Sequence, residues 1–159
     1  MNEQWSQRHP RGMVVGGSVE RGLQVRLEPD VPLESIKVGA FVVVQGTQLT
    51  YFGVVTDVSL EAVDPRYRST PPDVGNPFIA QVVTGAGVYG SLQVTPMLAL
   101  AVAGEGEPQP AKSVPAPFSR VSTASERDVQ LVFGVEDARH FVIGTPLDME
   151  TEVCLDMEK

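Results

Sequence analysis

The stretch that decides the fold runs from Phe41 to Leu60 and reads FVVVQGTQLTYFGVVTDVSL. Its first four residues form a continuous apolar run, which is typical of a strand buried on both faces. After a turn at 46–48, hydrophobicity alternates and predicts a second strand. Gly53 inside that strand predicts a bulge or a tight barrel bend. We expect one face to carry Phe52, Val54, Val58 and Leu60, and the other to carry Tyr51, Asp57 and Ser59.

More strands are expected on both sides of this stretch. Residues 14–19 predict a short strand interrupted by glycine, and Leu23, Val25 and Leu27 alternate with polar residues, as in a half-buried strand. Residues 88–102 are strand-like, with a break expected at Pro96. Their two faces would carry Leu92 and Val94 on one side and Tyr89, Gln93 and Thr95 on the other.

Two short helices are predicted by their end signals. Asn76 and Pro77 resemble an N-cap and the first helical residue, and Gly85 suits the position after the helix, although a strand is the alternative there. A second helix is predicted from the capping-box pair Thr123 and Glu126. Gly134 would end it, and its apolar side would hold Val129, Val132 and Phe133.

These elements predict the fold class and the domain organisation. Short strands, frequent glycines and few helices indicate a mainly β protein, a small closed or partly open β-barrel with one or two short helices. We divide the chain into a flexible N-terminal arm (1–12), the β-barrel (13–102), a Pro/Gly-rich linker (103–118), and a helix with two short strands that complete the barrel (119–159).

Composition restricts the partners and the compartment. Twelve Lys and Arg face twenty Asp and Glu, giving a net charge of −8, which opposes direct binding to nucleic acid. The single cysteine, Cys154, indicates a reducing compartment. With neither a long apolar run nor a secretion signal, we expect a cytoplasmic protein without a membrane partner.

No catalytic, cofactor-binding or metal-binding residue is predicted. Residues 85–90 match G-x-G-x-x-G, but a helix is expected before the glycines and a strand after them, the reverse of a dinucleotide site. We therefore interpret them as a helix-to-strand turn. His140 lacks further ligands at metal-site spacing, and Cys154 between acidic neighbours is better suited to a buried structural role.

The acidic residues near the end of the sequence, among them Asp148, Glu150 and Glu158, are typical of a solvated segment. A different candidate is the loop at 61–75, where Arg66, Tyr67 and Arg68 form a local basic patch. We treat those three residues as a candidate docking loop.

Several stretches together resemble one family. They are VGGSV at 15–19, GLQVRL at 22–27, IKVGAFVVV at 36–44 and YFGVVTDV at 51–58, followed by HFVIGTPL at 140–147 and CLDMEK at 154–159. In this order they resemble the HAS barrel, the N-terminal barrel of HerA-type DNA translocases that is shared with the catalytic-ring subunits of ATP synthase. The C-terminal runs resemble the segment leading into the HerA ATPase core.

The resemblance implies a non-catalytic assembly and docking domain of a hexameric ATP-dependent DNA translocase involved in DNA end processing. Its partners would be further copies, joined into a ring through the parent ATPase, and a nuclease. We expect the gene to continue past Lys159 into a P-loop ATPase core, because the strand-like residues 153–155 are followed by no cap, turn or closing element. Residues 1–159 themselves contain no G-x-x-x-x-G-K-[ST]. The alternative is a stand-alone barrel that binds a small ligand or cofactor. An independent hydrolase is disfavoured, since no nucleophile, base and orienting group are recognisable together.

Overall fold

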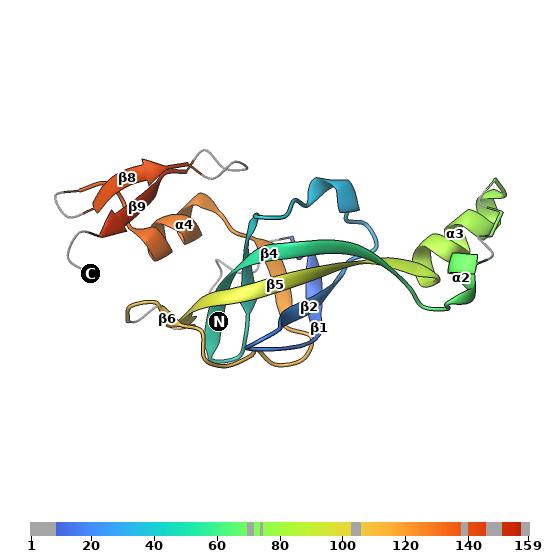
Figure 1. The fold of residues 1–159 in the computed structure, drawn as a ribbon, viewed down its shortest axis with the longest axis horizontal. Helices are drawn as coiled ribbons and strands as arrows, with labels where there is room; N and C mark the ends of the chain where they lie inside the picture. The colour runs from blue at the N-terminus through green and yellow to red at the C-terminus, as the bar shows by residue number, and fades with distance from the viewer. Residues whose placement is uncertain are drawn as a thin grey trace.

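The computed structural model describes residues 9–69, 72–73, 75–102, 106–137, 140–145 and 151–156, and strands predominate among them (Figure 1). Residues 1–8 of the expected N-terminal arm, and the acidic Asp148, Glu150 and Glu158, lie outside the described residues. None of the helices in these ranges is long and apolar enough to cross a membrane.

Six antiparallel strands pair in a circuit that returns to its starting point. The sheet order is β2-β1-β7-β3-β4-β5-β6, and β2 also pairs with β5. The mainly β barrel predicted from the sequence is therefore confirmed. The strand bounds are β1 Gly12–Ser18, β2 Gly22–Leu27, β3 Phe41–Gln45, β4 Leu49–Ala62, β5 Val88–Ala101, β6 Gln109–Pro110 and β7 Arg120–Thr123, with a short 3₁₀ turn η1 at Leu33–Ser35.

Aliphatic side chains fill the interior of this barrel. Leu23, Val25 and Leu27 all point inward from β2, as the alternation predicted. Strand β3 is buried on both faces, because Val42 and Val44 join the interior while Val43 packs in a second cluster outside the barrel wall. The interior cluster consists of Val14, Leu23, Val25, Leu27, Val42, Val44, Tyr51, Val55, Leu92, Val94, Ala99 and Val121.

Two bulges in the β4–β5 pairing decide which side chains point inward. Val55 pairs with Val94 but Asp57 pairs with Gln93, so Thr56 is an extra residue in β4. The Thr56 hydroxyl donates a hydrogen bond to the Gln93 carbonyl at 3.1 Å. The predicted division of faces along β4 is therefore wrong: Tyr51, Val55 and Val58 pack toward the interior, Phe52 packs outside, and Leu60 is exposed beyond the barrel.

The second bulge lies in β5, where Phe52 pairs with Leu98 and Gly53 pairs with Pro96, leaving Met97 unpaired. The break expected at Pro96 does not occur, because a bulge accommodates a residue without an N–H and the strand continues. The bulge expected at Gly53 is present at that place in the pairing, but its extra residue lies in β5, opposite Gly53, and not in β4. A Cβ atom on Gly53 would lie 2.7 Å from the Thr95 carbonyl oxygen and 2.9 Å from the Val94 side chain.

The first predicted helix is present as α3, Pro77–Ala86, preceded by the single turn α2, Arg66–Ser69. The Asn76 side chain accepts a hydrogen bond from the Phe78 N–H at 3.0 Å, so the predicted start is confirmed. The predicted end is wrong by two residues, because Gly85 lies within the helix and Gly87 caps it.

The second helix, α4, spans Glu126–Phe133 and begins two residues later than predicted. Thr123 belongs to β7, where it pairs with Val42, so the capping pair is Ser125 and Asp128 instead of Thr123 and Glu126. Gly134 ends the helix with φ of 79°, as predicted.

The segment expected to be a linker packs against the barrel. It supplies β6, which pairs with β5 at Leu98 and Ala99. The Tyr51 hydroxyl lies 2.9 Å from the Ser113 hydroxyl, and Pro115 is buried. A composition rich in proline and glycine does not by itself distinguish a spacer from a packed loop. Beyond α4, strands β8 (His140–Gly144) and β9 (Val153–Asp156) form a separate two-stranded sheet.

We predict that Gly53→Ala lowers the free energy of unfolding by about 1–3 kcal/mol, because its Cβ would displace the β5 backbone. The matched control is Gly16→Ala in β1, whose Cβ would meet only the Gln24 side chain at an ordinary 3.6 Å. Denaturant midpoints measure both. Equal midpoints for the two variants would show that β5 does not approach Gly53 closely.

Candidate protein-docking site

The β4–β5 hairpin extends beyond the barrel as an arm. Each strand has fourteen residues, and the pairing continues from Leu49–Ala101 to Ala62–Val88, whereas β2 contacts β5 only over residues 91–94. Figure 1 shows this hairpin running away from the barrel with α2 and α3 at its tip. We call residues 60–90 the arm.

Large apolar side chains of the arm are exposed. Leu60 is 64% exposed, Val63 60% and Phe78 73%. An exposed apolar residue is ordinary on its own, but several of them on a projecting element are typical of a contact surface. The arm therefore exposes apolar side chains on an element that projects from the barrel.

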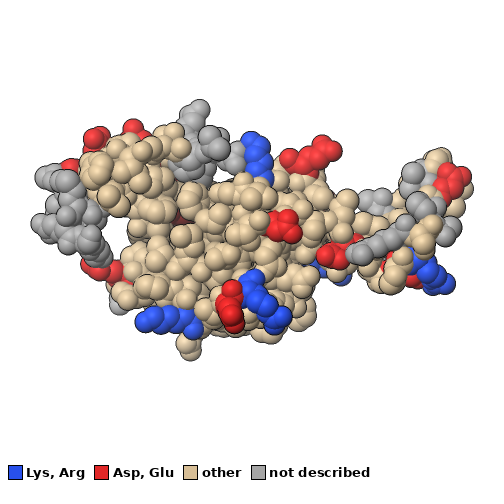
Figure 2. All heavy atoms as spheres, in the orientation of Figure 1, with Lys and Arg blue, Asp and Glu red and all other residues tan. Residues whose placement is uncertain are grey.

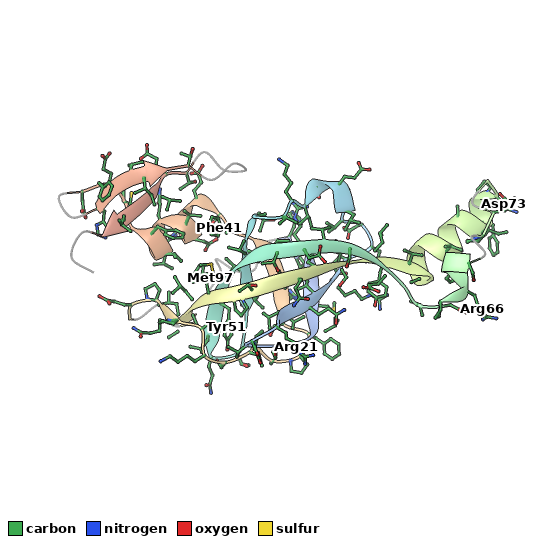
Figure 3. The ribbon with its side chains drawn as sticks, viewed as in Figure 1. Arg21, Phe41, Tyr51, Arg66, Asp73 and Met97 are labelled. Carbon is green, nitrogen blue, oxygen red and sulfur yellow. The ribbon has the colours of Figure 1, made fainter. Side chains whose placement is uncertain are left out.

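The predicted docking residues Arg66, Tyr67 and Arg68 form most of α2 on this arm (Figure 3). The Arg66 guanidinium contacts the Asp64 carboxylate at 2.6 Å in an exposed ion pair. The pKa of Asp64 is lowered by this hydrogen bond, and that of Arg66 is raised by it. The ring of Tyr67 packs beside Gly87, and the side chain of Arg68 is outside the described set. The pairing with Asp64 makes the patch less basic than its sequence indicates.

At the other end of the molecule, α4 and the outside of the barrel enclose an apolar hollow of about 230 Å³, the α4 groove. Its walls are Phe41, Val42, Phe52, Gly53, Met97, Leu98, Pro110, Ala124, Asp128, Val129, Val132 and Phe133. The predicted apolar side of α4 is confirmed, since Val129, Val132 and Phe133 all face this hollow. Phe133 packs edge-to-face on Phe41, with ring centroids 5.7 Å apart.

The only acidic residue among those walls, Asp128, is held by the start of α4. Its carboxylate accepts hydrogen bonds from the Ser125 N–H at 2.7 Å and from the Ser125 hydroxyl at 2.6 Å. The carboxylate thus serves the N-terminus of the helix, where backbone N–H groups have no intrahelical partner. The groove therefore suits apolar groups, because its other side chains are apolar and its one carboxylate is already hydrogen-bonded.

Two further hollows of the described structure are more polar. One, of about 290 Å³, lies at the base of the arm, where the Arg26 guanidinium sits 4.2 Å from the centre of the Tyr89 ring. The other, of about 250 Å³, lies between α4 and β9 and is lined by Glu126, Glu136 and Glu152. All three hollows lie outside the barrel, whose interior is filled by its own side chains.

The remaining motif residues are placed as follows. Residues 85–90 form the junction between α3 and β5, a helix-to-strand turn as predicted.

His140 begins β8, and its Nδ1 lies 2.9 Å from the Asp137 carboxylate. Cys154 is buried in β9, and burial raises the pKa of its thiol, helped by Glu152 and Glu136. Across the described ranges, no three His, Cys, Asp or Glu side chains gather as metal ligands.

The α4 groove was not predicted from the sequence. Met97 and Leu98 lie in a strand-like run in which the bulge is not recognisable, and Phe41 lies in another run some 55 residues earlier. The apolar side of α4 was one usable signal, because an amphipathic helix needs an apolar surface to cover. Which surface it covers depends on pairings between distant segments.

A closed antiparallel barrel with a solid interior, a projecting arm and an apolar groove defines a small β-barrel domain whose accessible features lie on its outside. A family model of the HAS barrel domain matches residues 12–105, more than half of the chain, and the chain belongs to this family. A search of curated proteins found no match to this chain. The match ends before β7, the strand that lies between β1 and β3 in the barrel.

We predict that Asp128→Ala lowers the free energy of unfolding by about 1–2 kcal/mol, because the capping hydrogen bonds at Ser125 are lost. Glu126→Ala, which removes an exposed carboxylate from the same helical turn, is the control. Denaturant midpoints give the energies, and amide hydrogen exchange over 126–133 shows whether α4 opens first. Equal losses in both variants would indicate a general charge effect on the helix.

We also predict that the Cys154 thiol reacts slowly with a disulfide reagent at pH 8, because burial and the raised pKa keep it protonated and covered. Reaction should accelerate to the rate of a free thiol after unfolding in denaturant. A Val38→Cys, Cys154→Ala chain provides an exposed control thiol, since Val38 is 61% exposed. A native Cys154 as reactive as that control would contradict the buried structural role.

Proposed function

We propose that this chain is the non-catalytic assembly and docking domain of a HerA-like hexameric ATP-dependent DNA translocase that acts in DNA end processing. The observation that carries the proposal is the HAS barrel with apolar residues exposed on its arm. Apolar area on such a surface stays in contact with water, which is unfavourable, unless another protein covers it.

The filled interior favours docking over the alternative of a barrel that binds a small ligand. Small-molecule sites are concave and usually have volumes of about 300–1,000 Å³. Here the space enclosed by the strands is occupied by clustered Val and Leu side chains. The α4 groove is smaller than that range, and it lacks the converging polar groups that would orient a cofactor.

The HerA assignment is supported by the order of the sequence stretches, including those at 140–147 and 154–159, which resemble the lead-in to the HerA ATPase core. The proposed partners are further copies in a ring and a nuclease, in the cytoplasm. The nucleotide chemistry would belong to a P-loop core encoded beyond Lys159. DNA would contact other parts of the assembly, because a domain with a net charge of −8 repels phosphates.

The test compares the product of the complete gene with the chain 1–159. We predict that the complete product hydrolyses ATP and has a hexameric mass by light scattering. The chain 1–159 should give no heat with Mg-ATP in calorimetry. It should also leave the anisotropy of a labelled duplex unchanged near physiological salt.

A micromolar dissociation constant for Mg-ATP on the chain 1–159 would overturn the non-catalytic assignment. A gene that stops at Lys159 with no motor encoded beside it would remove the translocase and favour the ligand-binding barrel. Tight binding to duplex DNA that weakens steeply with salt would show that a basic face outweighs the net charge.

A further inference from the structure

Phe78 is the most exposed large apolar side chain in the described structure, at 73%. It lies in the first turn of α3, where the Asn76 carboxamide and Pro77 fix the start of the helix. The side chain is therefore presented on a capped helical turn at the tip of the arm. A rigid aromatic residue on a projecting element is typical of an anchor for a protein interface, since aromatic residues provide much contact area at low entropic cost.

The α4 groove has the chemistry and size to receive such an anchor. Two of its walls, Phe41 and Phe133, are aromatic and already pack edge-to-face. Met97 at the rim is 52% exposed, and a thioether makes favourable contacts with an aromatic ring. Asp128 is engaged by the helix cap, so an apolar guest would not compete with a free charge.

The anchor and the groove cannot meet within one molecule. The arm tip and the α4 region lie at opposite ends of the longest axis (Figure 1), and Figure 3 places Arg66 at one end and Phe41 and Met97 toward the other. The pairing of β4 with β5 along fourteen residues keeps the arm extended. In Figure 2, residues other than Lys, Arg, Asp and Glu cover most of the face between these two ends.

We propose that Phe78 of one copy inserts into the α4 groove of the next copy, in a head-to-tail contact. This inference rests on the proposed function. It names the residues through which this domain would touch the neighbouring copy in the ring. A contact between two different patches of one chain repeats from copy to copy and closes into a ring when the rotation allows.

One aromatic anchor gives weak association between isolated chains. In a ring, the parent ATPase would hold neighbouring copies together and raise the effective concentration of each anchor near its groove. The contact would then set the spacing and direction of the barrels around the ring. A nuclease residue occupying the same groove is the rival arrangement, and the test separates the two.

The test is disulfide trapping between copies in a Cys154→Ala background. A chain with Pro77→Cys, at an exposed position that keeps the Phe78 anchor, is mixed with a differently tagged chain carrying Met97→Cys, and both are oxidised. We expect the mixed dimer to form on the order of tenfold faster than with a Val38→Cys partner, because bound copies bring the two thiols together. Val38 is the matched control, because it lies on a loop of the barrel and is 61% exposed, against 52% for Met97. Equal rates for both partners would overturn the proposal.

A second variant removes the arm tip without disturbing the paired strands. Replacing 63–87 with an Asn-Gly turn between Ala62 and Val88, which are paired, closes the hairpin with a favoured two-residue loop. This deletion should weaken self-association in sedimentation. In the Pro77→Cys chain, Phe78→Asp should abolish trapping, while Val38→Asp should not. If the complete gene product still forms an active hexamer without trapping, the proposed function stands and this inference fails. If it forms no hexamer and does not hydrolyse ATP, the proposed function itself fails.

Discussion

The antiparallel pairing of β4 with β5, and the two bulges within it, is the constraint on which the rest of the structure depends. Strand side chains alternate between faces, so one extra residue moves every later side chain to the opposite face. The extra Thr56 in β4 brings Val58 to the interior, and the extra Met97 in β5 brings Ala99 to the interior and Leu98 and Leu100 to the outer cluster. Without these shifts, the interior and outer clusters would exchange members.

The same pairing creates both the α4 groove and the arm. At one end, the bulge at Met97 turns that side chain outward to the rim of the α4 groove, while Phe52 and Leu98 supply its floor. At the other end, the strands continue past their last contact with β2 and form the arm. The pairing also explains why Gly53 is glycine: the β5 backbone crosses at a distance that a Cβ atom would not permit.

The sequence predicted those parts of the fold that local chemistry determines. Alternation in β2, the apolar run of β3 and the Asn76-Pro77 start of α3 each depend on neighbouring residues, and each was confirmed. The capping residue of α4 was misplaced because Thr123–Glu126 and Ser125–Asp128 both fit the pattern. What decides between them is the pairing of Thr123 with Val42, a contact between segments about eighty residues apart. The candidate site was recognised only as a loop around Arg66, since the groove is assembled from distant elements.

Strand β7 likewise depends on contacts between segments that are far apart in the sequence. This strand follows the 12–105 region, yet it lies between β1 and β3 and contributes Val121, which is fully buried in the interior cluster. Immediately after it, Ala124 and α4 cover the outer face of the wall that β7 has just completed. Closing the barrel and forming the groove are therefore consecutive consequences of one segment. The outer groove and the arm, which are assigned above to contacts between proteins, therefore lie at opposite ends of the same two strands.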